Sequence, residues 1–157
     1  MGEIRTVHAI GSALAVPELA TVGDVDSAII SLEFAGGGLG VVDLSRNSVY
    51  GYDIATEILG TRGALRVGYL RENPLLVMTK SQIAHDTVPF FIERFAEAYT
   101  TQLQDFVDNA LHEREPSVTL QDGIEALRVG LAATQSLKAR QSVEVAAIAE
   151  ISGDSVK

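Results

Sequence analysis

The stretch Ser27-Ala-Ile-Ile-Ser-Leu-Glu-Phe34 decides the fold class, because apolar residues occupy every second position along it. One face of the extended chain is therefore apolar and carries Ala28, Ile30, Leu32 and Phe34, which predicts a half-buried antiparallel strand. Gly36-Gly37-Gly38 follows and supplies the positive φ angles of a tight hairpin, so Leu39–Arg46 is predicted to return as the paired strand. A phosphate-binding loop is excluded for these glycines, because the spacing Gly-x-Gly-x-x-Gly is not met and a strand follows instead of a helix.

Further strands are predicted on both sides of this hairpin, with turn residues between them and no intervening helix. They are Ile4–Leu14, Gly51–Leu59, Ala64–Tyr69, Leu75–Lys80 and a short final strand, Ser142–Val145. Strands that succeed one another at hairpin spacing favour an antiparallel or mixed sheet over alternating strand–helix units.

Two long helices are predicted in the second half, where the apolar period changes to three and four residues. The first begins after Pro89 and carries the stripe Phe91, Phe95, Tyr99, Leu103, Phe106 and Ala110. The second begins at a capping box formed by Thr119 and Asp122, and its stripe is Ile124, Leu127, Leu131, Thr134 and Leu137. Both stripes predict packing against a sheet.

The predicted fold class is therefore α+β, with a largely antiparallel or mixed sheet of about six strands and two long helices on one face. The other face of the sheet is left open. We expect another chain or another domain to cover it, unless it is unusually polar.

Composition limits the possible functions. The chain has 157 residues, a length that suits one domain. Its net charge of −9 repels phosphate backbones. It contains no cysteine, which excludes disulfides and thiolate metal sites. No apolar run reaches membrane-spanning length, and together these features predict a soluble, cytoplasmic protein without nucleic-acid or membrane partners. His8, His85 and His112 lack metal-ligand spacing, and no nucleophilic triad is visible, so the sequence predicts neither a metal site nor catalytic residues.

The strongest candidate site lies in the segment from Asp43 to Gly63. It contains Arg46, Tyr50, Tyr52 and Asp53. Tyr offers a flat apolar ring and a hydroxyl to a small hydroxylated ligand. Packing alone also explains Tyr in strands, and an Asp–Arg pair can simply fasten a turn, so both interpretations stay open. Tyr50 and Tyr52 have the same parity, so a regular strand would direct both hydroxyls to one face.

Several motifs resemble a known family of oxidoreductases. They are Gly-Asp24-Val-Asp26-Ser-Ala-Ile-Ile, Phe34-x-x-Gly, Ser45-Arg46-Asn-Ser-Val-Tyr50-Gly-Tyr52-Asp53, Glu57-Ile-Leu-Gly60-Thr-Arg-Gly63, Arg94-Phe95-x-x-Ala-Tyr99, Phe106-Val, Pro116-x-Val118 with Asp122-Gly123, and Ala132-Ala133-x-x-Ser136. Residues 2–145 thus resemble the C-terminal domain of Gfo/Idh/MocA-type NAD(P)-dependent oxidoreductases, most closely the inositol 2-dehydrogenases, and residues 146–157 form a tail.

The resemblance implies a division of labour between two domains. In the family, an N-terminal Rossmann domain holds the nicotinamide cofactor, and the C-terminal domain lines the substrate pocket and builds dimers or tetramers through the open sheet face. It implies Tyr50 and Tyr52 as contacts to a small polyol substrate, and Arg46 and Asp53 as residues that support the loop. Ala55 departs from the family, whose members often carry a larger polar residue there.

The family motifs that bind NAD(P) and carry catalysis are missing from this chain. The Gly-x-Gly-x-x-Gly loop, the Glu-Lys-Pro segment and the Asp-x-x-x-His motif belong N-terminal to this region. Hydride transfer needs a nicotinamide and a base, so we expect the chain to bind no cofactor and to be inert without a Rossmann domain in cis or in trans. The alternative hypothesis is a stand-alone oligomeric module that binds a ligand or another protein without catalysis.

Overall fold

The computed structural model describes residues 1–68, 71 and 73–148. It contains two compact units, one formed by residues 1–47 with the chain from residue 117 onward, the other by residues 48–116. The predicted tail at 146–157 is described only in part, because residues 149–157 lie outside the described residues. Its first residues belong to a short 3-10 helix, η2 (Val145–Ala147).

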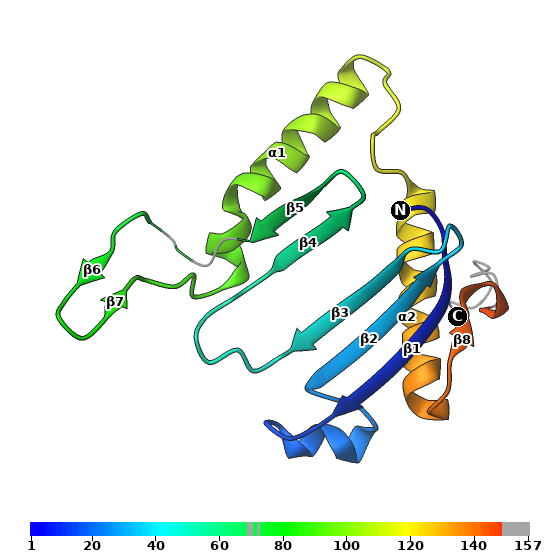
Figure 1. Cartoon of the computed structure of the whole chain (residues 1–157). Coiled ribbons are helices and arrows are strands. Elements are labelled where there is room, and N and C mark those ends of the chain that lie inside the picture. The colour runs from blue at the N-terminus through cyan, green and yellow to red at the C-terminus, as the bar shows by residue number, and fades with distance from the viewer. Residues whose placement is uncertain (69–70, 72, 149–157) are drawn as a thin grey trace. The chain divides into compact units, whose positions relative to one another are not determined.

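The first unit is built on a four-stranded antiparallel sheet (Figure 1). Its strands are β1 (Ile4–Ser12), β2 (Ser27–Phe34), β3 (Leu39–Ser45) and β8 (Val143–Glu144), in the order β3-β2-β1-β8. A 3-10 helix, η1 (Pro17–Val22), fills the connection between β1 and β2. The predicted strands of this unit are therefore confirmed to within a few residues at their ends.

The hairpin between β2 and β3 forms as its glycines predict. Gly37 has a φ of 82°, and the backbone N–H of Phe34 donates to the Gly38 carbonyl oxygen at 2.9 Å. The predicted alternation along β2 is also confirmed, because Ala28 and Phe34 are buried whereas Ile29 is 49% exposed. Glycine supplies a turn here that other residues enter only at a conformational cost.

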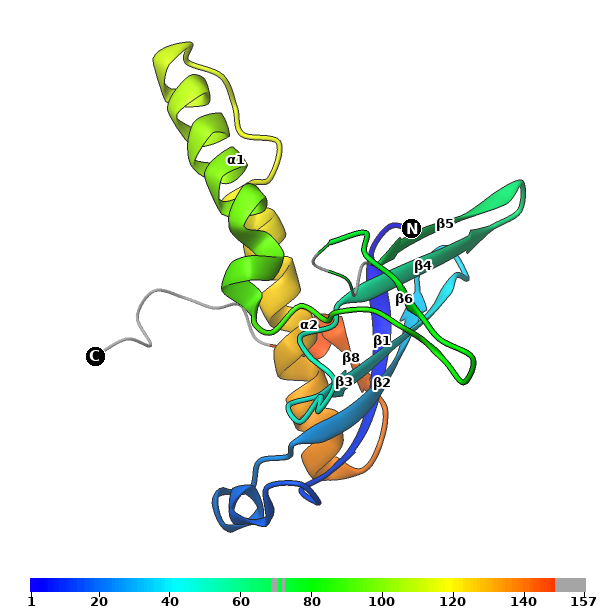
Figure 2. The same ribbon diagram turned by 90° about the vertical axis from the view of Figure 1, so that its left-hand side faces the viewer.

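One helix, α2 (Leu120–Ala139), covers one face of this sheet, as Figures 1 and 2 both show. The core between helix and sheet consists of small and β-branched side chains: Val7, Ala9, Ala132, Ala133, Val143 and Val145. Buried Ser136 completes the contact, since its Oγ accepts from Ala9 N at 2.9 Å and donates to the Gln141 carbonyl oxygen at 2.6 Å.

The predicted apolar stripe of α2 is wrong for most of its length. Leu127 and Leu131 are 52% and 41% exposed, and Thr134 is also exposed. The helix instead turns its small residues towards β1, because Ala and Ser let two backbones approach closely. A Cβ added to Gly11 of β1 would lie only 3.2 Å from a methyl group of Leu137.

The start of α2 confirms the predicted capping box. The Thr119 hydroxyl accepts from the backbone N–H of Asp122, and the Asp122 carboxylate accepts from the backbone N–H of Thr119 at 2.7 Å. These reciprocal bonds satisfy N–H groups that the first turn of a helix leaves without partners. They also lower the pKa of the Asp122 carboxyl, chiefly through the Thr119 backbone N–H.

The second unit contains two separate hairpins and one long helix. The hairpins pair β4 (Ala55–Gly60) with β5 (Gly63–Gly68), and β6 (Val77–Met78) with β7 (Ile83–Ala84). The helix α1 (Phe91–Leu111) is interrupted at Phe95, whose φ and ψ are −119° and 15°. None of the residues of α1 is buried, and Leu103 and Phe106 are 67% and 69% exposed. The prediction that the apolar stripe of this helix packs against a sheet is therefore not met within the second unit.

The expectation of one sheet with about six strands is therefore corrected. Among the described residues, the ladder ends at β3, because residues 46–54 do not continue as a strand and Gly51 has a φ of 122°. The predicted strand Gly51–Leu59 begins only at Ala55, and Leu75–Lys80 shortens to two residues. The predicted end of Ala64–Tyr69 lies outside the described residues.

The face of the four-stranded sheet opposite α2 carries large apolar side chains among polar and charged ones. The residues whose side chains belong to it by register include Thr6, His8, Ile10, Ile29, Ser31, Glu33, Leu39, Val41 and Asp43. Ile10, Leu39 and Val41 are 57%, 77% and 70% exposed, which is unusual for large apolar groups on neighbouring strands.

Candidate functional site

The segment that carries the predicted site residues connects β3 to β4. Tyr50 lies in a turn in which the backbone N–H of Gly51 donates to the Ser48 carbonyl oxygen at 3.3 Å, and Tyr52 lies in the extended stretch that follows. The two tyrosines are therefore not on one regular strand, so the argument from strand parity does not apply to their hydroxyls.

Gly51 holds this segment close to the chain that leads into α1. The backbone N–H of Tyr52 donates to the Val88 carbonyl oxygen at 2.7 Å. A Cβ added to Gly51 would lie 2.6 Å from that same oxygen, and the φ of 122° at Gly51 is one that L-residues rarely adopt. Only glycine allows the two backbones to run this closely at this angle. The tyrosine segment is thereby fixed to residues 87–88.

Tyr52 belongs to an aromatic cluster at the start of α1. Its ring centroid lies 6.4, 6.2 and 6.1 Å from those of Phe90, Phe91 and Phe95. The Arg94 guanidinium carbon lies 5.1 Å from the centre of the Phe95 ring, a cation–π arrangement. The contacts of Tyr52 with Phe90 and Phe95 are edge-on, a geometry that stabilises aromatic pairs beyond the effect of burial. Tyr52 is thus half-buried and anchored, whereas Tyr50 is 54% exposed and accessible to a ligand.

Arg46 is held at the end of β3 by a pair of aspartates. Its backbone N–H donates to the Asp26 carbonyl oxygen at 2.7 Å, and its guanidinium lies 3.8 Å from the Asp24 carboxylate. That ion pair is exposed, so we expect it to contribute little to stability. Asp53 is exposed, and its carboxylate makes no hydrogen bond or ion pair with the described residues, so its supporting role stays a prediction.

Sequence reasoning assigned no role to Asp26, which is the most buried charged residue described, at 2% exposure. Its carboxylate accepts from Ala15 N at 2.7 Å, Val16 N at 2.8 Å and Ser27 Oγ at 2.9 Å. The Val16 N–H is the main cause that lowers the pKa of the Asp26 carboxyl. One signal in the sequence could have indicated this role. Asp26 stands directly before a predicted strand and after a loop that contains Pro17 and Gly23, and a carboxylate in such a place can accept hydrogen bonds from the backbone N–H groups of the loop.

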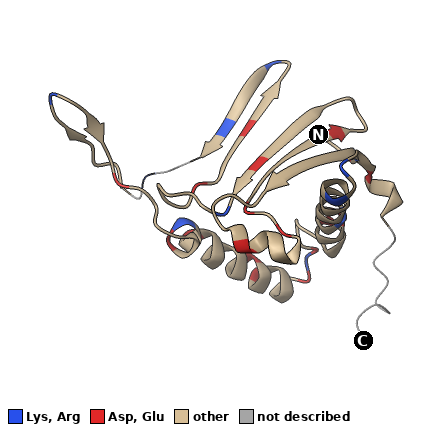
Figure 3. Cartoon of the chain, turned by 90° about the horizontal axis from the view of Figure 1, so that it is seen from below, with Lys and Arg blue, Asp and Glu red and all other residues tan. Residues whose placement is uncertain are grey.

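Neither a basic cluster nor a metal-binding group of side chains is found in the described parts of the chain (Figure 3). Basic residues are spread over separate elements, such as Arg66 on β5, Arg94 on α1 and Lys138 on α2 (Figure 3). Among residues 1–68, 71 and 73–148, no three His, Asp or Glu side chains are grouped so that they could hold a metal ion. Within the same residues, neither long helix combines the length and hydrophobicity that a membrane span requires.

Comparison with known proteins identifies the family. A family model described as "Oxidoreductase family, C-terminal alpha/beta domain", of the Gfo/Idh/MocA type, matches residues 1–145. The chain belongs to this family. The resemblance read from the motifs around Tyr50 and Ser136 is thereby confirmed, together with the α+β fold class.

Relatives in the family include several inositol dehydrogenases. Myo-inositol 2-dehydrogenase of Thermotoga maritima is 38% identical over 145 residues, which are 91% of this chain and 43% of that protein. Scyllo-inositol 2-dehydrogenase (NAD(+)) of Bacillus subtilis is 37% identical over 91% of this chain and 42% of its own length. The chain thus spans less than half the length of these relatives.

Solved structures agree with this assignment. The crystal structure of scyllo-inositol dehydrogenase from Lactobacillus casei with bound NAD(H) and scyllo-inositol has a TM-score of 0.87 and 31% identity, covering 92% of this chain and 43% of that one. The structure of a probable dehydrogenase from Thermotoga maritima has a TM-score of 0.89 and 35% identity, covering 94% and 45%.

Proposed function

We propose that this chain is the substrate-binding and oligomerising part of an inositol 2-dehydrogenase-like oxidoreductase, which oxidises a secondary ring alcohol to a ketone. The observation that carries the proposal is the match of residues 1–145 to the C-terminal domain of a family whose relatives at 37–38% identity are inositol dehydrogenases. The proposed domain is residues 2–145 and the proposed tail is residues 146–157, and the match over residues 1–145 supports this division.

Within this domain, Tyr50 and Tyr52 are the proposed contacts to a small polyol. Tyr50 is exposed in a turn whose neighbour Gly51 is fixed against Val88, so its phenol is accessible on an anchored backbone. A phenolic hydroxyl both donates and accepts hydrogen bonds, which suits the hydroxyls of a cyclitol. Tyr52 contributes mainly through its ring, which the phenylalanines of the aromatic cluster hold in place.

Arg46 and Asp53 are proposed to support this segment from its two ends. The contacts of Arg46 with Asp24 and Asp26 favour such a role at the end of β3. Asp53 directly follows Tyr52 in the sequence.

Cofactor binding belongs, in this proposal, to the remaining part of a full-length protein. Gly36–Gly38 lies in the turn between β2 and β3, so no helix N-terminus follows it to receive a pyrophosphate. This glycine segment therefore does not fit a pyrophosphate site. In the proposal, NAD(P) is held by a Rossmann domain joined to this chain or supplied separately. That domain would also carry the base that takes the hydroxyl proton.

Oligomerisation is proposed to use the sheet face opposite α2. Ile10, Ile29, Leu39 and Val41 are exposed on it, and a second copy of the same face would remove them from water. The expected assembly is a dimer or a tetramer, which light scattering after size exclusion would detect.

The test of the proposal is reconstitution. The chain is joined to, or mixed with, the N-terminal part of the Thermotoga maritima relative, and NADH formation is followed at 340 nm with myo-inositol and NAD. Polyol-dependent NADH formation is expected from the combination and from neither part alone. Its absence in both the joined and the mixed form, with myo- and scyllo-inositol, would reject the proposal. Cyclitol binding without turnover would instead favour the non-catalytic module.

A further inference from the structure

The first turns of α1 contain a break in the helix that no residue type in its sequence explains. Phe95 has φ and ψ of −119° and 15°, outside the helical range, although Phe91–Leu111 is otherwise one helix. Residues 91–99 contain neither proline nor glycine, the residues that most often interrupt a helix. The break therefore follows from the contacts that the side chains make at this position.

The break allows two neighbouring side chains to meet. In a regular helix, residues that follow one another directly point in different directions and do not face each other. At the break, the guanidinium carbon of Arg94 lies 5.1 Å from the centre of the Phe95 ring. The interruption of the helix and the cation–π contact thus belong to one arrangement.

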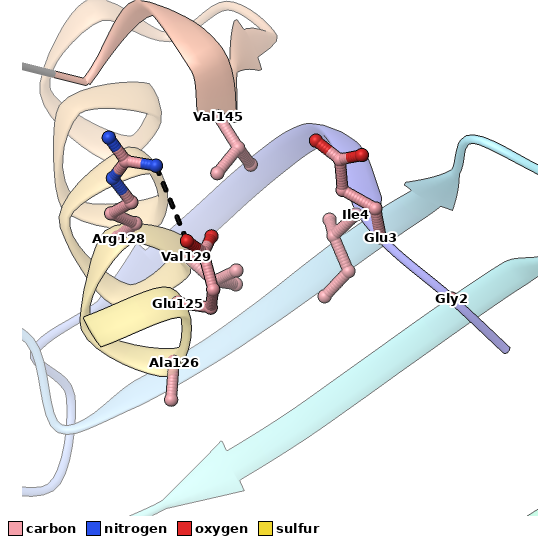
Figure 4. Close-up of a pocket in the computed structure, with 8 residues that line it drawn as sticks. All are labelled: Gly2, Glu3, Ile4, Glu125, Ala126, Arg128, Val129 and Val145. Carbon is pink, nitrogen blue, oxygen red and sulfur yellow. Dashed lines mark hydrogen bonds and ion pairs between the residues drawn. The ribbon is translucent and has the colours of Figure 1, made fainter. Parts of the chain in front are cut away.

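Arg94 makes this contact in place of an ion pair. Glu97 follows three residues later on α1, a spacing at which an acid and a base can pair on a helix. Arg128 of α2 forms such a pair with Glu125, three residues earlier, at 3.4 Å (Figure 4). Arg94 forms no ion pair with any carboxylate that the structure describes. Its charge is therefore directed to an aromatic ring and not to an acid.

Stability alone does not favour this arrangement. Nε of Arg94 is buried without a hydrogen-bond partner among the described residues. Such an unpaired N–H lowers stability, so its presence needs an explanation other than the strength of the fold. Local departures of this kind are typical of residues that serve a functional site.

The Phe95 ring connects Arg94 to the candidate site. It lies edge-on to the ring of Tyr52, with 6.1 Å between the centroids and 86° between the planes. The hydroxyl of Tyr52 makes no hydrogen bond within the described parts of the chain, so contacts of its ring hold this side chain. Among the described residues, Phe95 is the one phenylalanine around Tyr52 that a cation also contacts.

We propose that Arg94 is a positioning residue for the polyol site. Stacked on Phe95, it keeps that ring edge-on against Tyr52, and the ring of Tyr52 thereby stays where a polyol contacts it. Arg94 acts through Phe95 and does not itself contact the polyol. The inference rests on the proposed function, in which Tyr52 contacts the substrate, and it adds the residue that holds Tyr52 in place.

The first test uses near-ultraviolet circular dichroism of the chain by itself. The chain has four tyrosines and no tryptophan, so tyrosine dominates this spectrum. Tyr52→Phe keeps a ring but removes the tyrosine signal, and thus measures the contribution of Tyr52. Arg94→Met keeps an unbranched side chain of similar helix propensity and removes the cation.

We expect Arg94→Met to lose roughly half or more of the contribution of Tyr52, because an unfixed ring gives little signal. Arg114→Met is the matched control, since Arg114 is exposed just after the end of α1, and it should leave the spectrum unchanged. An unchanged spectrum in Arg94→Met would overturn the inference.

The second test is the steady-state kinetics of the joined two-part enzyme. Arg94→Met should raise the KM for myo-inositol about two- to tenfold and leave the KM for NAD unchanged, whereas Arg114→Met should match the original chain. A merely structural role would reduce the amount of folded enzyme, which lowers the apparent kcat at an unchanged KM. Arg94→Lys restores a cation without the planar guanidinium and should give an intermediate KM. An unchanged KM for myo-inositol in Arg94→Met would overturn the inference.

A double-mutant cycle tests whether Arg94 acts through Tyr52. In Tyr52→Leu, which lacks the aromatic ring, the addition of Arg94→Met should cause no further rise in the KM for myo-inositol. A second rise by the same factor would mean that Arg94 acts without Tyr52 and would overturn the inference. If Tyr52→Leu does not fold, the KM of Arg94→Met alone decides between the outcomes.

The spectrum and the kinetics together separate this inference from the proposed function. A changed spectrum in Arg94→Met, with no NADH formed by the original joined enzyme, would reject the function and leave the link between Arg94 and Tyr52 standing. NADH formation by the original enzyme, with an unchanged spectrum or an unchanged KM in Arg94→Met, would reject the positioning role alone.

Discussion

Ser136→Ala tests the contact that holds α2 on the sheet. Ser136 is fully buried, and its hydroxyl accepts from Ala9 N at 2.9 Å while donating to the Gln141 carbonyl oxygen at 2.6 Å. The substitution leaves no cavity but removes both partners. The N–H of Ala9, whose residue is 3% exposed, then stays buried without an acceptor, whereas Gln141 is exposed and its oxygen can turn to water.

An unpaired buried N–H costs about 1–3 kcal/mol. Alanine recovers roughly 0.5 kcal/mol through its better helix propensity. The net loss in the free energy of unfolding is therefore about 1.5 kcal/mol, which lowers the melting temperature by roughly 3–6 °C for a chain of this size.

Urea denaturation followed by circular dichroism measures this difference. The midpoint for Ser136→Ala should fall without a change in the slope, because the same surface is exposed on unfolding. Thr134→Ala is the matched control on the same helix. Its hydroxyl donates to the Gly130 carbonyl oxygen at 3.0 Å and is exposed, so its loss should stay within about 0.5 kcal/mol. Equal stability of the two variants would refute the assignment of Ser136 as the bond between helix and sheet.

Three further predictions concern local geometry. Gly51→Ala forces a Cβ to 2.6 Å from the Val88 carbonyl oxygen at a φ of 122°. The free energy of unfolding should therefore fall by about 1–3 kcal/mol, and amide hydrogen exchange at Tyr52 should become faster. Unchanged exchange would contradict the close approach of the two backbones. Thr119→Ala removes the N-cap of α2 and should lower the free energy of unfolding by about 1 kcal/mol in the same urea assay. An unchanged free energy of unfolding would mean that water replaces the cap, and it would contradict this prediction. The folded-state pKa of Asp26 is lowered, so its contribution is present above the unfolded pKa of about 4 and is lost as the pH falls through the folded value. Asp26→Asn should therefore flatten the acid limb of a stability–pH curve, and an unchanged limb would contradict the pKa shift.

Local sequence signals predicted the elements that depend on neighbours in the chain. The alternation along β2, the glycines of the β2–β3 hairpin and the Thr119–Asp122 box each specify their conformation within a few residues. Their success follows from short-range sterics and hydrogen bonds.

The predictions that failed depend on partners far away in the sequence. The stripe with Leu127 and Leu131 looked apolar, yet Ala132, Ala133 and Ser136 face β1, because close backbone approach and the bond to Ala9 outweigh side-chain size. The close approach of Gly51 to Val88, at which a Cβ would lie 2.6 Å from the Val88 carbonyl oxygen, is likewise not revealed by any period in the sequence.

The sequence proposed the position of the candidate site, which stays a prediction, and it could not give the geometry of that segment. The motif around Tyr50 and Tyr52 marked the segment, and the resemblance supplied its proposed role. Neither the position of the two residues along a strand nor the composition could predict that the ring of Tyr50 is exposed whereas the ring of Tyr52 is anchored. That difference arises from the contacts of Tyr52 with Phe90, Phe91 and Phe95. Asp26 was part of a quoted motif, but its burial became evident only in the folded chain.

The measurement that tests the central claim most directly is the steady-state kinetics of Tyr50→Phe in the joined two-part enzyme. The variant loses one hydroxyl at an exposed position and keeps the ring. If Tyr50 binds the polyol, the KM for myo-inositol should rise about three- to tenfold, as the loss of one hydrogen bond implies, while the KM for NAD stays unchanged. An unchanged KM for myo-inositol, in an enzyme that still forms NADH, would contradict the assignment of this segment as the polyol site.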